Sequence, residues 1–129
     1  MLFKTVGFKE ITLVMIGGLA GTLVRYLLSI FLIPGYLPWG TLFANILGCF
    51  IMGLTVYFHP DDKLLWAIGF CGSLTTMSTF AYENSSAIIQ HRYLDSFIYI
   101  ATSVIAGAIA AFIGSKLAPK TSYYKKEEV

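Results

Sequence analysis

Charged residues are scarce in this chain of 129 amino acids. Lys, Arg, Asp and Glu make up 12% of the sequence, whereas apolar residues make up 57% and the mean hydropathy is +0.73. A soluble domain carries roughly 25% charged residues, so the composition indicates a membrane protein. The net charge of +2 is too small to suggest a nucleic-acid-binding surface.

Cysteine and histidine are also rare. The chain has two of each, Cys49, Cys71, His59 and His91, and they are too far apart in sequence to form a metal-ligand motif. Buried cysteines of membrane spans usually behave as small apolar residues. The sequence contains no phosphate-binding loop, nucleophile triad or paired carboxylates, so we predict that the protein is not an enzyme.

Four long apolar stretches are separated by short polar connections. Each is long enough for the roughly 20 residues that a helix needs to cross hydrocarbon. They lie at about 11–33, 40–58, 64–89 and 94–117. The first is too long for a signal peptide and is interrupted by Arg25. We expect an all-α membrane protein, one four-helix transmembrane domain over residues 1–129, whose charged tail at 118–129 is disordered.

Positive charges are distributed unevenly between the two sides of the membrane. With four spans, the termini and the 59–63 loop share one side, and the other side holds only Arg92. The first side holds seven lysines: Lys4, Lys9, Lys63, Lys116, Lys120, Lys125 and Lys126. The positive-inside rule therefore predicts that both termini lie in the cytoplasm.

The third stretch carries polar groups for which lipid offers no partner. Glu83 lies in its second half, and its middle holds Ser73, Thr75, Thr76, Ser78 and Thr79. Glycine lowers helix stability by roughly 1 kcal/mol relative to alanine, and hydroxyls compete for backbone groups. Two structures remain open. Either the helix breaks near Gly72–Thr76 and its carbonyls bind a monovalent cation, or it is continuous and its hydroxyls bond to the preceding turn.

Small residues recur at intervals of four in three of the spans. Such faces let helix backbones approach closely in lipid, either within one chain or between subunits. They are Gly17 and Gly21; Gly40, Ala44 and Gly48; and Ser103, Gly107 and Ala111.

Three linked motifs carry a resemblance that covers nearly the whole chain. They are Gly17-Gly18-xx-Gly21-xxx-Arg25-Tyr26, then Gly40-Thr41-Leu42-xx-Asn45-xx-Gly48, then Gly69-Phe-Cys-Gly72-Ser-Leu-Thr75-Thr76-Met77-Ser78-Thr79-Phe80 followed by Glu83. In this order they resemble the motifs of the bacterial fluoride channel family, whose members are also called CrcB or Fluc proteins.

The resemblance implies a fluoride-selective channel of the bacterial cell membrane, which exports fluoride passively and lowers its toxicity. It implies an antiparallel, dual-topology dimer with two fluoride pathways along its interface. A structural sodium ion at the dimer centre would be held by the broken third helices, through the carbonyls of Gly72 and Thr75. The implied pathway residues are Asn45 as an amide donor, Phe80 as the second ring of an aromatic pair, and Ser78, Thr79, Tyr99 and Ser103.

The physical chemistry of fluoride agrees with these roles. The ion is small and strongly hydrated, so N–H and O–H donors must replace its water while still releasing it. An aromatic ring offers a positive edge to an anion without a full charge. Met77 departs from the family pattern, because the first ring of the pair is usually Phe. Since a thioether is soft and polarizable, we expect Met77 to form a flexible apolar wall of a pathway that still conducts.

Several alternatives stay open. Asn45 by its position alone is an interhelical hydrogen-bonding residue. Arg25 and Glu83 need partners inside the membrane, and they form either a buried pair or separate polar networks near a pore entrance. An antiparallel homodimer favours little charge asymmetry, so a homodimer and a heterodimer with a related subunit of opposite orientation are both compatible with the sequence.

Two other functions compete with that of a channel. A small four-span proton-coupled exporter of the dual-topology kind needs a membrane carboxylate, and only Glu83 could serve. A membrane assembly factor without transport activity would explain the small-residue faces, but it would not explain the Ser/Thr cluster.

Overall fold

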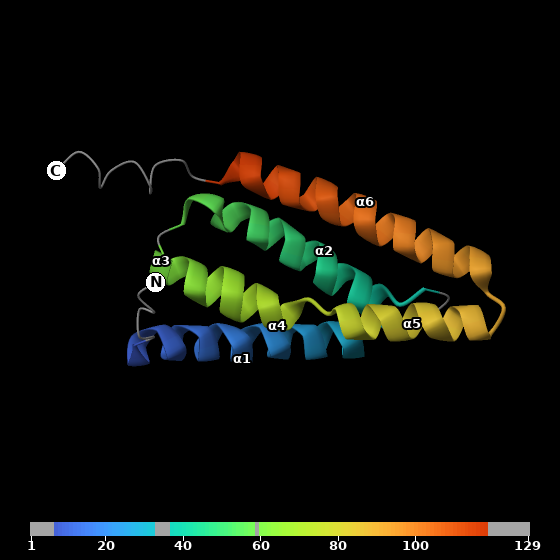
Figure 1. Cartoon of the computed structure of the whole chain (residues 1–129), viewed down its shortest axis with the longest axis horizontal. Coiled ribbons are helices and arrows are strands. Elements are labelled where there is room, and N and C mark those ends of the chain that lie inside the picture. The colour runs from blue at the N-terminus through green and yellow to red at the C-terminus, as the bar shows by residue number, and fades with distance from the viewer. Residues whose placement is uncertain (1–6, 33–36, 59, 119–129) are drawn as a thin grey trace, which may run out of the picture.

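Every regular element of the computed structural model is helical in the residues that the structure describes, which are 7–32, 37–58 and 60–118 (Figure 1). The chain forms α1 (Phe8–Phe31), α2 (Trp39–Leu54), a 3₁₀ turn η1 (Thr55–Tyr57), α3 (Pro60–Lys63), a π-helical segment η2 (Leu64–Cys71), α4 (Gly72–Leu74), α5 (Met77–Ile89) and α6 (Tyr93–Leu117).

The helices form four segments that are long and apolar enough to cross a membrane. These are Phe8–Phe31, Trp39–Tyr57, Asp61–Ile89 and Tyr93–Leu117. They match the four predicted spans, so the prediction of an all-α protein with four membrane-spanning helices is confirmed. The tail predicted to be disordered, 118–129, lies outside the described residues except for Ala118, and four of the seven lysines also lie outside them: Lys4, Lys120, Lys125 and Lys126.

Local sequence explains where the helices begin and end. Pro38 precedes α2 and Thr76 precedes α5, where its hydroxyl oxygen accepts a hydrogen bond from the backbone of Thr79. The turn into α6 uses His91 at φ 57°, a left-handed conformation that ends the preceding helix. Two hydrogen bonds close this turn, from His91 N to Ile88 O and from Arg92 N to Ala87 O.

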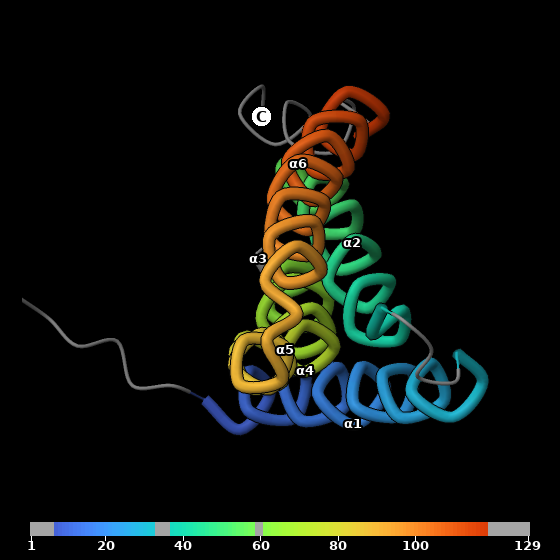
Figure 2. The backbone as a smooth tube through the Cα atoms, turned by 90° about the vertical axis from the view of Figure 1, so that its right-hand side faces the viewer, coloured from blue at the N-terminus to red at the C-terminus, as the bar shows by residue number. Residues whose placement is uncertain are grey.

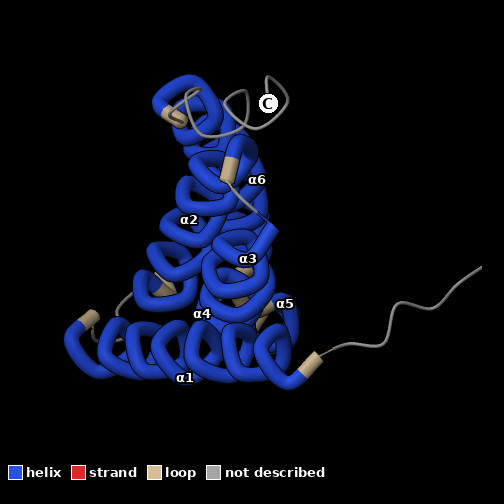
Figure 3. Tube along the Cα trace, turned by 90° about the vertical axis from the view of Figure 1, so that its left-hand side faces the viewer, coloured by secondary structure: helices blue, strands red, loops and turns tan. Residues whose placement is uncertain are grey.

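Glycines allow α1 to lie directly on the third membrane segment. A Cβ on Gly17 would overlap the carbonyl oxygen of Leu65, and one on Gly21 would overlap that of Phe70. Figures 2 and 3 show α1 crossing the other helices, which rise from one side of it. Gly17 and Gly21 therefore pack against another helix of the same chain. The first small-residue face serves contacts within one chain rather than between subunits.

The same device joins α2 to α6. A Cβ on Gly53 would overlap the carbonyl oxygen of Ala111, and one on Gly114 would overlap that of Phe50. The best-buried apolar cluster lies between these contacts and α1, and it consists of Ala44, Phe70, Cys71 and Leu74. Most large apolar side chains point outward, as lipid allows, because hydrocarbon solvates them as well as a protein core does.

Candidate functional site

The site begins where α4 ends and α5 has not yet begun. Thr75 (φ −78°, ψ 153°) and Thr76 (φ −147°, ψ 120°) are extended between the two helices. Figure 1 shows this short link in yellow-green at the middle of the third membrane segment. Backbone groups of extended residues cannot form helical hydrogen bonds, so they need other partners at membrane depth.

Asn45 of α2 supplies those partners for Thr76. Its Oδ1 accepts a hydrogen bond from Thr76 N at 2.8 Å, and its Nδ2 donates to Thr76 O at 3.2 Å. The side chain thus satisfies both backbone groups of one extended residue, and one amide hydrogen remains available. The amide therefore links α2 to the extended residue that precedes α5, which agrees with the hydrogen-bonding role that its position alone suggested.

Two carbonyls next to this clamp lose their usual helical donors. The fourth residue after Gly72 is Thr76, whose N–H is bound to Asn45, and the fourth after Thr75 is Thr79, whose N–H is bound to Thr76 Oγ1. No hydrogen bond from any described residue reaches the carbonyl of Gly72 or Thr75. Gly72 is exposed, and a Cβ built on it meets nothing within 4 Å. Both oxygens are therefore available to an external ligand.

A groove between α2 and α6, which we call the α2–α6 groove, brings together four of the predicted pathway residues. It has a volume of about 470 Å³ and is lined in part by Asn45, Met77, Phe80 and Ser103. Met77 is 74% exposed at the rim. The Phe80 ring lies 5.0 Å from the ring of Tyr99, centroid to centroid, at an interplanar angle of 48°. Phe80 therefore has an aromatic neighbour within its own chain.

Ser78 and Thr79 do not share that groove. They line a separate cavity of about 310 Å³ together with Arg25, Thr41 and Thr76. The hydroxyl of Thr79 accepts a hydrogen bond from Thr76 Oγ1 at 3.0 Å. The structure therefore divides the four predicted pathway residues of α5 between two cavities, with Met77 and Phe80 in one and Ser78 and Thr79 in the other.

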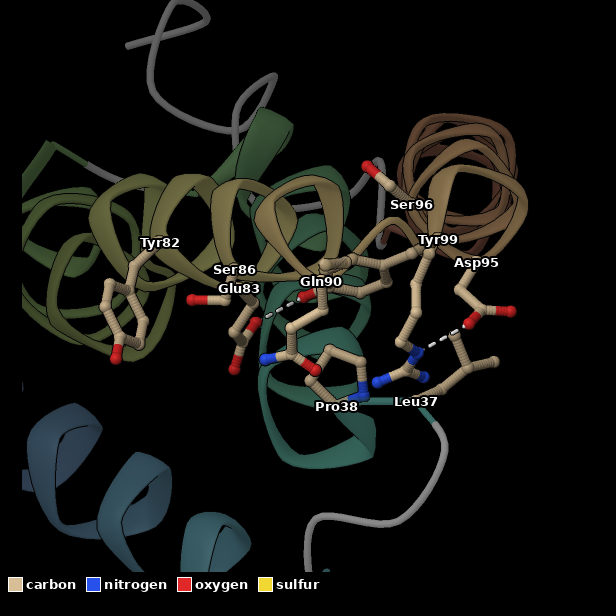
Figure 4. Close-up of a pocket in the computed structure, with 11 residues that line it drawn as sticks. Leu37, Pro38, Tyr82, Glu83, Ser86, Gln90, Asp95, Ser96 and Tyr99 are labelled. Atoms are coloured by element: carbon tan, nitrogen blue, oxygen red, sulfur yellow. Dashed lines mark hydrogen bonds and ion pairs between the residues drawn. The ribbon is translucent and has the colours of Figure 1, made fainter.

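Glu83 and Tyr99 meet in a third pocket of about 290 Å³, shown in Figure 4. The carboxylate accepts hydrogen bonds from Thr41 Oγ1 at 2.7 Å and from the Tyr99 hydroxyl at 2.8 Å. Among the described residues, Arg25 and Glu83 do not form an ion pair with each other. The sequence left open a buried Arg25–Glu83 pair or separate polar networks. Within one chain, Glu83 belongs to a polar network.

Asp95 and Ser96 line the same pocket, and Asn84 is hydrogen-bonded to Ser96; the sequence alone had not indicated a role for these polar residues. Asn84 Nδ2 donates to Phe80 O at 2.8 Å, and Ser96 Oγ donates to Asn84 Oδ1 at 2.9 Å. Both side chains are buried, as is Asp95, which pairs with Arg92 at 2.7 Å. An Asn next to Glu83 inside an apolar span was the signal that could have identified this cluster.

Ser103 is half-buried beside the α2–α6 groove. Its hydroxyl donates to the carbonyl of Tyr99 at 2.7 Å, one turn earlier in α6. Among the described residues no group of three His, Cys, Asp or Glu side chains could hold a metal ion. A hard cation at this site would therefore depend on backbone carbonyls.

Comparison with known proteins identifies the family. The family model described as "CrcB-like protein, Camphor Resistance (CrcB)" matches residues 12–115. The chain is 43% identical to the "Fluoride-specific ion channel FluC" of Leptospira interrogans over 117 residues, covering 82% of this chain and 91% of that protein. It is 40% identical to the protein of the same name from Gloeothece citriformis over 114 residues, covering 81% and 93%.

A third relative matches over a longer range. The chain is 39% identical to the "Fluoride-specific ion channel FluC 2" of Halalkalibacterium halodurans over 127 residues, covering 94% of each chain. The family predicted from the three motifs is thereby confirmed. The chain belongs to the CrcB-like protein family, and it is a multi-pass protein of the bacterial cell membrane rather than an enzyme.

Proposed function

We propose that this protein is a fluoride-selective ion channel, which lets fluoride leave the bacterial cell passively and so lowers its toxicity. The observation that carries the proposal is the match over most of the chain to relatives named as fluoride-specific ion channels. The rival, a proton-coupled exporter, needs Glu83 to exchange protons with its cargo. In the structure that carboxylate is already bound by two hydroxyls, which gives the rival no support.

In this proposal, the α2–α6 groove of each subunit forms one side of a fluoride pathway. Asn45 would offer its remaining amide hydrogen to the ion, and Phe80 would offer its ring edge. Met77 at the rim would act as a flexible apolar wall, and Ser103 would line the same groove. Ser78 and Thr79 would line a second stretch of the route in the neighbouring cavity, and Tyr99 would position the Phe80 ring.

The open grooves support the proposal of a dimer. One chain does not enclose a pathway, so a second subunit is needed to cover the grooves, and we propose that it lies antiparallel to the first. A homodimer and a heterodimer with a related subunit remain alternatives, because the seven lysines on one side oppose dual insertion of a single chain. Reconstituting this chain alone separates them, since fluoride efflux from such liposomes would contradict an obligate heterodimer.

We further propose that the third membrane helix is broken at Thr75–Thr76 so that it can hold a structural sodium ion. The donor chemistry fits, because the carbonyls of Gly72 and Thr75 have no hydrogen-bond donor among the described residues. Two such pairs, one from each subunit, would offer a hard monovalent cation an all-oxygen environment. The bound ion would balance the carbonyl dipoles of the two broken helices and would not be transported.

The decisive experiment measures anion efflux from liposomes with a fluoride electrode and a chloride electrode. We expect fluoride efflux without a proton gradient, no chloride efflux, and a loss of dimer when sodium is replaced by N-methylglucamine. Equal fluoride and chloride efflux, or export that requires a proton gradient, would overturn the proposed function. Dimer stability that does not depend on sodium would overturn the sodium site alone.

A further inference from the structure

The α2–α6 groove has a second chemical character, because sulfur is concentrated in it. Both cysteines of the chain, Cys49 and Cys71, line the groove, and so do Met52 and Met77. Cys49 and Met52 are three residues apart on α2, so they share one face of that helix. Cys71 ends η2, and Met77 begins α5 across the extended residues.

The hydroxyl protons and the Asn45 amide of this groove are engaged in hydrogen bonds, whereas the carbonyl oxygen of Thr75 accepts none from a described residue. The hydroxyl of Thr75 donates to Cys71 O at 2.9 Å, and that of Thr76 donates to Thr79. The amide of Asn45 is bound to the backbone of Thr76. By contrast, neither cysteine forms a disulfide among the described residues, so both are free thiols. The sulfur atoms are therefore the soft donors of the groove's wall, beside the hard carbonyl oxygen of Thr75; of the two methionines, Met52 accepts a hydrogen bond from Thr55 Oγ1 at 4.0 Å through its sulfur.

Because Gly107 has no side chain, there is space beside the thiol of Cys49. Opposite it on α6 stands Gly107, on which even a Cβ would lie 3.4 Å from the Cys49 Sγ, within ordinary contact. Cys49 is only half-buried, whereas Cys71 is 1% exposed and forms part of the deeper wall. Methionine is flexible, so Met52 and Met77 can adjust their sulfur positions to a bound ion.

We propose that the α2–α6 groove binds a soft monovalent cation, Cu⁺ or Ag⁺, through Cys49 and Cys71 with Met52 and Met77 as thioether ligands. Thiolate and thioether sulfur select Cu⁺ over hard cations such as Na⁺. On binding, each thiol releases its proton to water and a metal–sulfur bond forms, with no change in oxidation state. Its ligands are sulfur atoms rather than the backbone carbonyls proposed for sodium, although Thr75 lines the same groove, and its existence does not depend on the proposed function.

The first test measures binding of Ag⁺, which is stable to air oxidation. The purified protein in detergent and nitrate buffer is mixed with silver nitrate and desalted, and bound silver is counted by mass spectrometry. We expect about one ion per chain, and at least ~10-fold weaker binding in the double variant Cys49→Ser/Cys71→Ser. Cys49→Ala provides a second variant should the double one fail to fold, as judged by circular dichroism.

Methionine variants test the thioether ligands. Met52→Leu and Met77→Leu should each weaken silver binding, whereas Met15→Leu should not, because Met15 lies on α1 outside the groove and is 67% exposed. Silver binding that is unchanged in both cysteine variants would overturn the site. Equal weakening by Met15→Leu and Met52→Leu would overturn the assignment of Met52.

Fluoride efflux gives a second readout, and this one does rest on the proposed pathway. If fluoride passes through the α2–α6 groove, micromolar Ag⁺ should block efflux, and the block should weaken in the cysteine variants relative to their own silver-free flux. Binding without block would uphold the metal site and refute the fluoride route through this groove. Efflux without any silver binding would refute the metal site and leave the channel standing.

Discussion

Gly17 and Gly18 offer a sharp test of how α1 packs. They are adjacent in one helix, yet a Cβ on Gly17 would overlap Leu65 O and lie 2.9 Å from Phe70 N, whereas a Cβ on Gly18 meets nothing within 4 Å. The two substitutions make the same chemical change at adjacent positions, so a difference between them reports the surroundings of each residue. We therefore predict opposite effects of Gly17→Ala and Gly18→Ala on the free energy of unfolding.

The magnitudes follow from two terms. Alanine is favoured over glycine inside a helix by about 1 kcal/mol, and this gain applies at both positions. Overpacking costs typically 1–3 kcal/mol, and backbone atoms cannot rotate away, so we expect about 2–3 kcal/mol at Gly17. Gly18→Ala should therefore stabilise the protein by about 1 kcal/mol, and Gly17→Ala should destabilise it by about 1–2 kcal/mol.

The assay is equilibrium unfolding by sodium dodecyl sulfate in dodecyl maltoside micelles, followed by circular dichroism. The difference of about 2–3 kcal/mol between the variants corresponds to roughly 30–150-fold in the unfolding equilibrium constant. Shifts of the same sign and size for both variants would refute the proposed contact of Gly17 with η2. Destabilisation by Gly18→Ala would show that a second surface packs on α1 at that residue.

Three further predictions concern the site itself. Asn45→Ala should lower the unfolding free energy by about 2–3 kcal/mol, because it leaves both backbone groups of Thr76 unsatisfied; an effect below that of Ser115→Ala would contradict the clamp. Tyr99→Phe should cost about 1.5–3 kcal/mol in the same titration, through its lost bond to Glu83. Met77→Phe should change fluoride flux by less than ~10-fold, because one aromatic contact contributes no more than that to the free energy. A rise of several orders of magnitude would mean that methionine impairs the native pathway.

Much of the fold could be predicted from apolar length alone. Lipid satisfies no backbone group, so a long apolar stretch must be helical, and the four spans follow. The role of the first small-residue face could not be predicted. Gly17 would serve a subunit interface equally well, and only the position of Gly69 against it shows that the contact is internal.

The candidate site was predicted residue by residue, but its arrangement was not. The resemblance assigned Met77, Ser78, Thr79 and Phe80 to the fluoride pathway, whereas the structure places Ser78 and Thr79 in a different cavity from Met77 and Phe80. Helical periodicity explains the division, because residues three apart share a face and their immediate neighbours do not. Helical periodicity alone could have separated these residues, provided that the segment from Met77 onward was taken as a helix.

The sequence by itself determined the class of environment, the number of spans and the family, because these depend on composition and on residues that are close along the chain. The tertiary structure decided what the polar residues bind. Asn45 and Thr76 are 31 positions apart, and only the register between α2 and the extended link brings the amide onto that backbone. The availability of the Gly72 and Thr75 carbonyls has the same origin, since their donors are diverted by side chains whose positions tertiary packing sets.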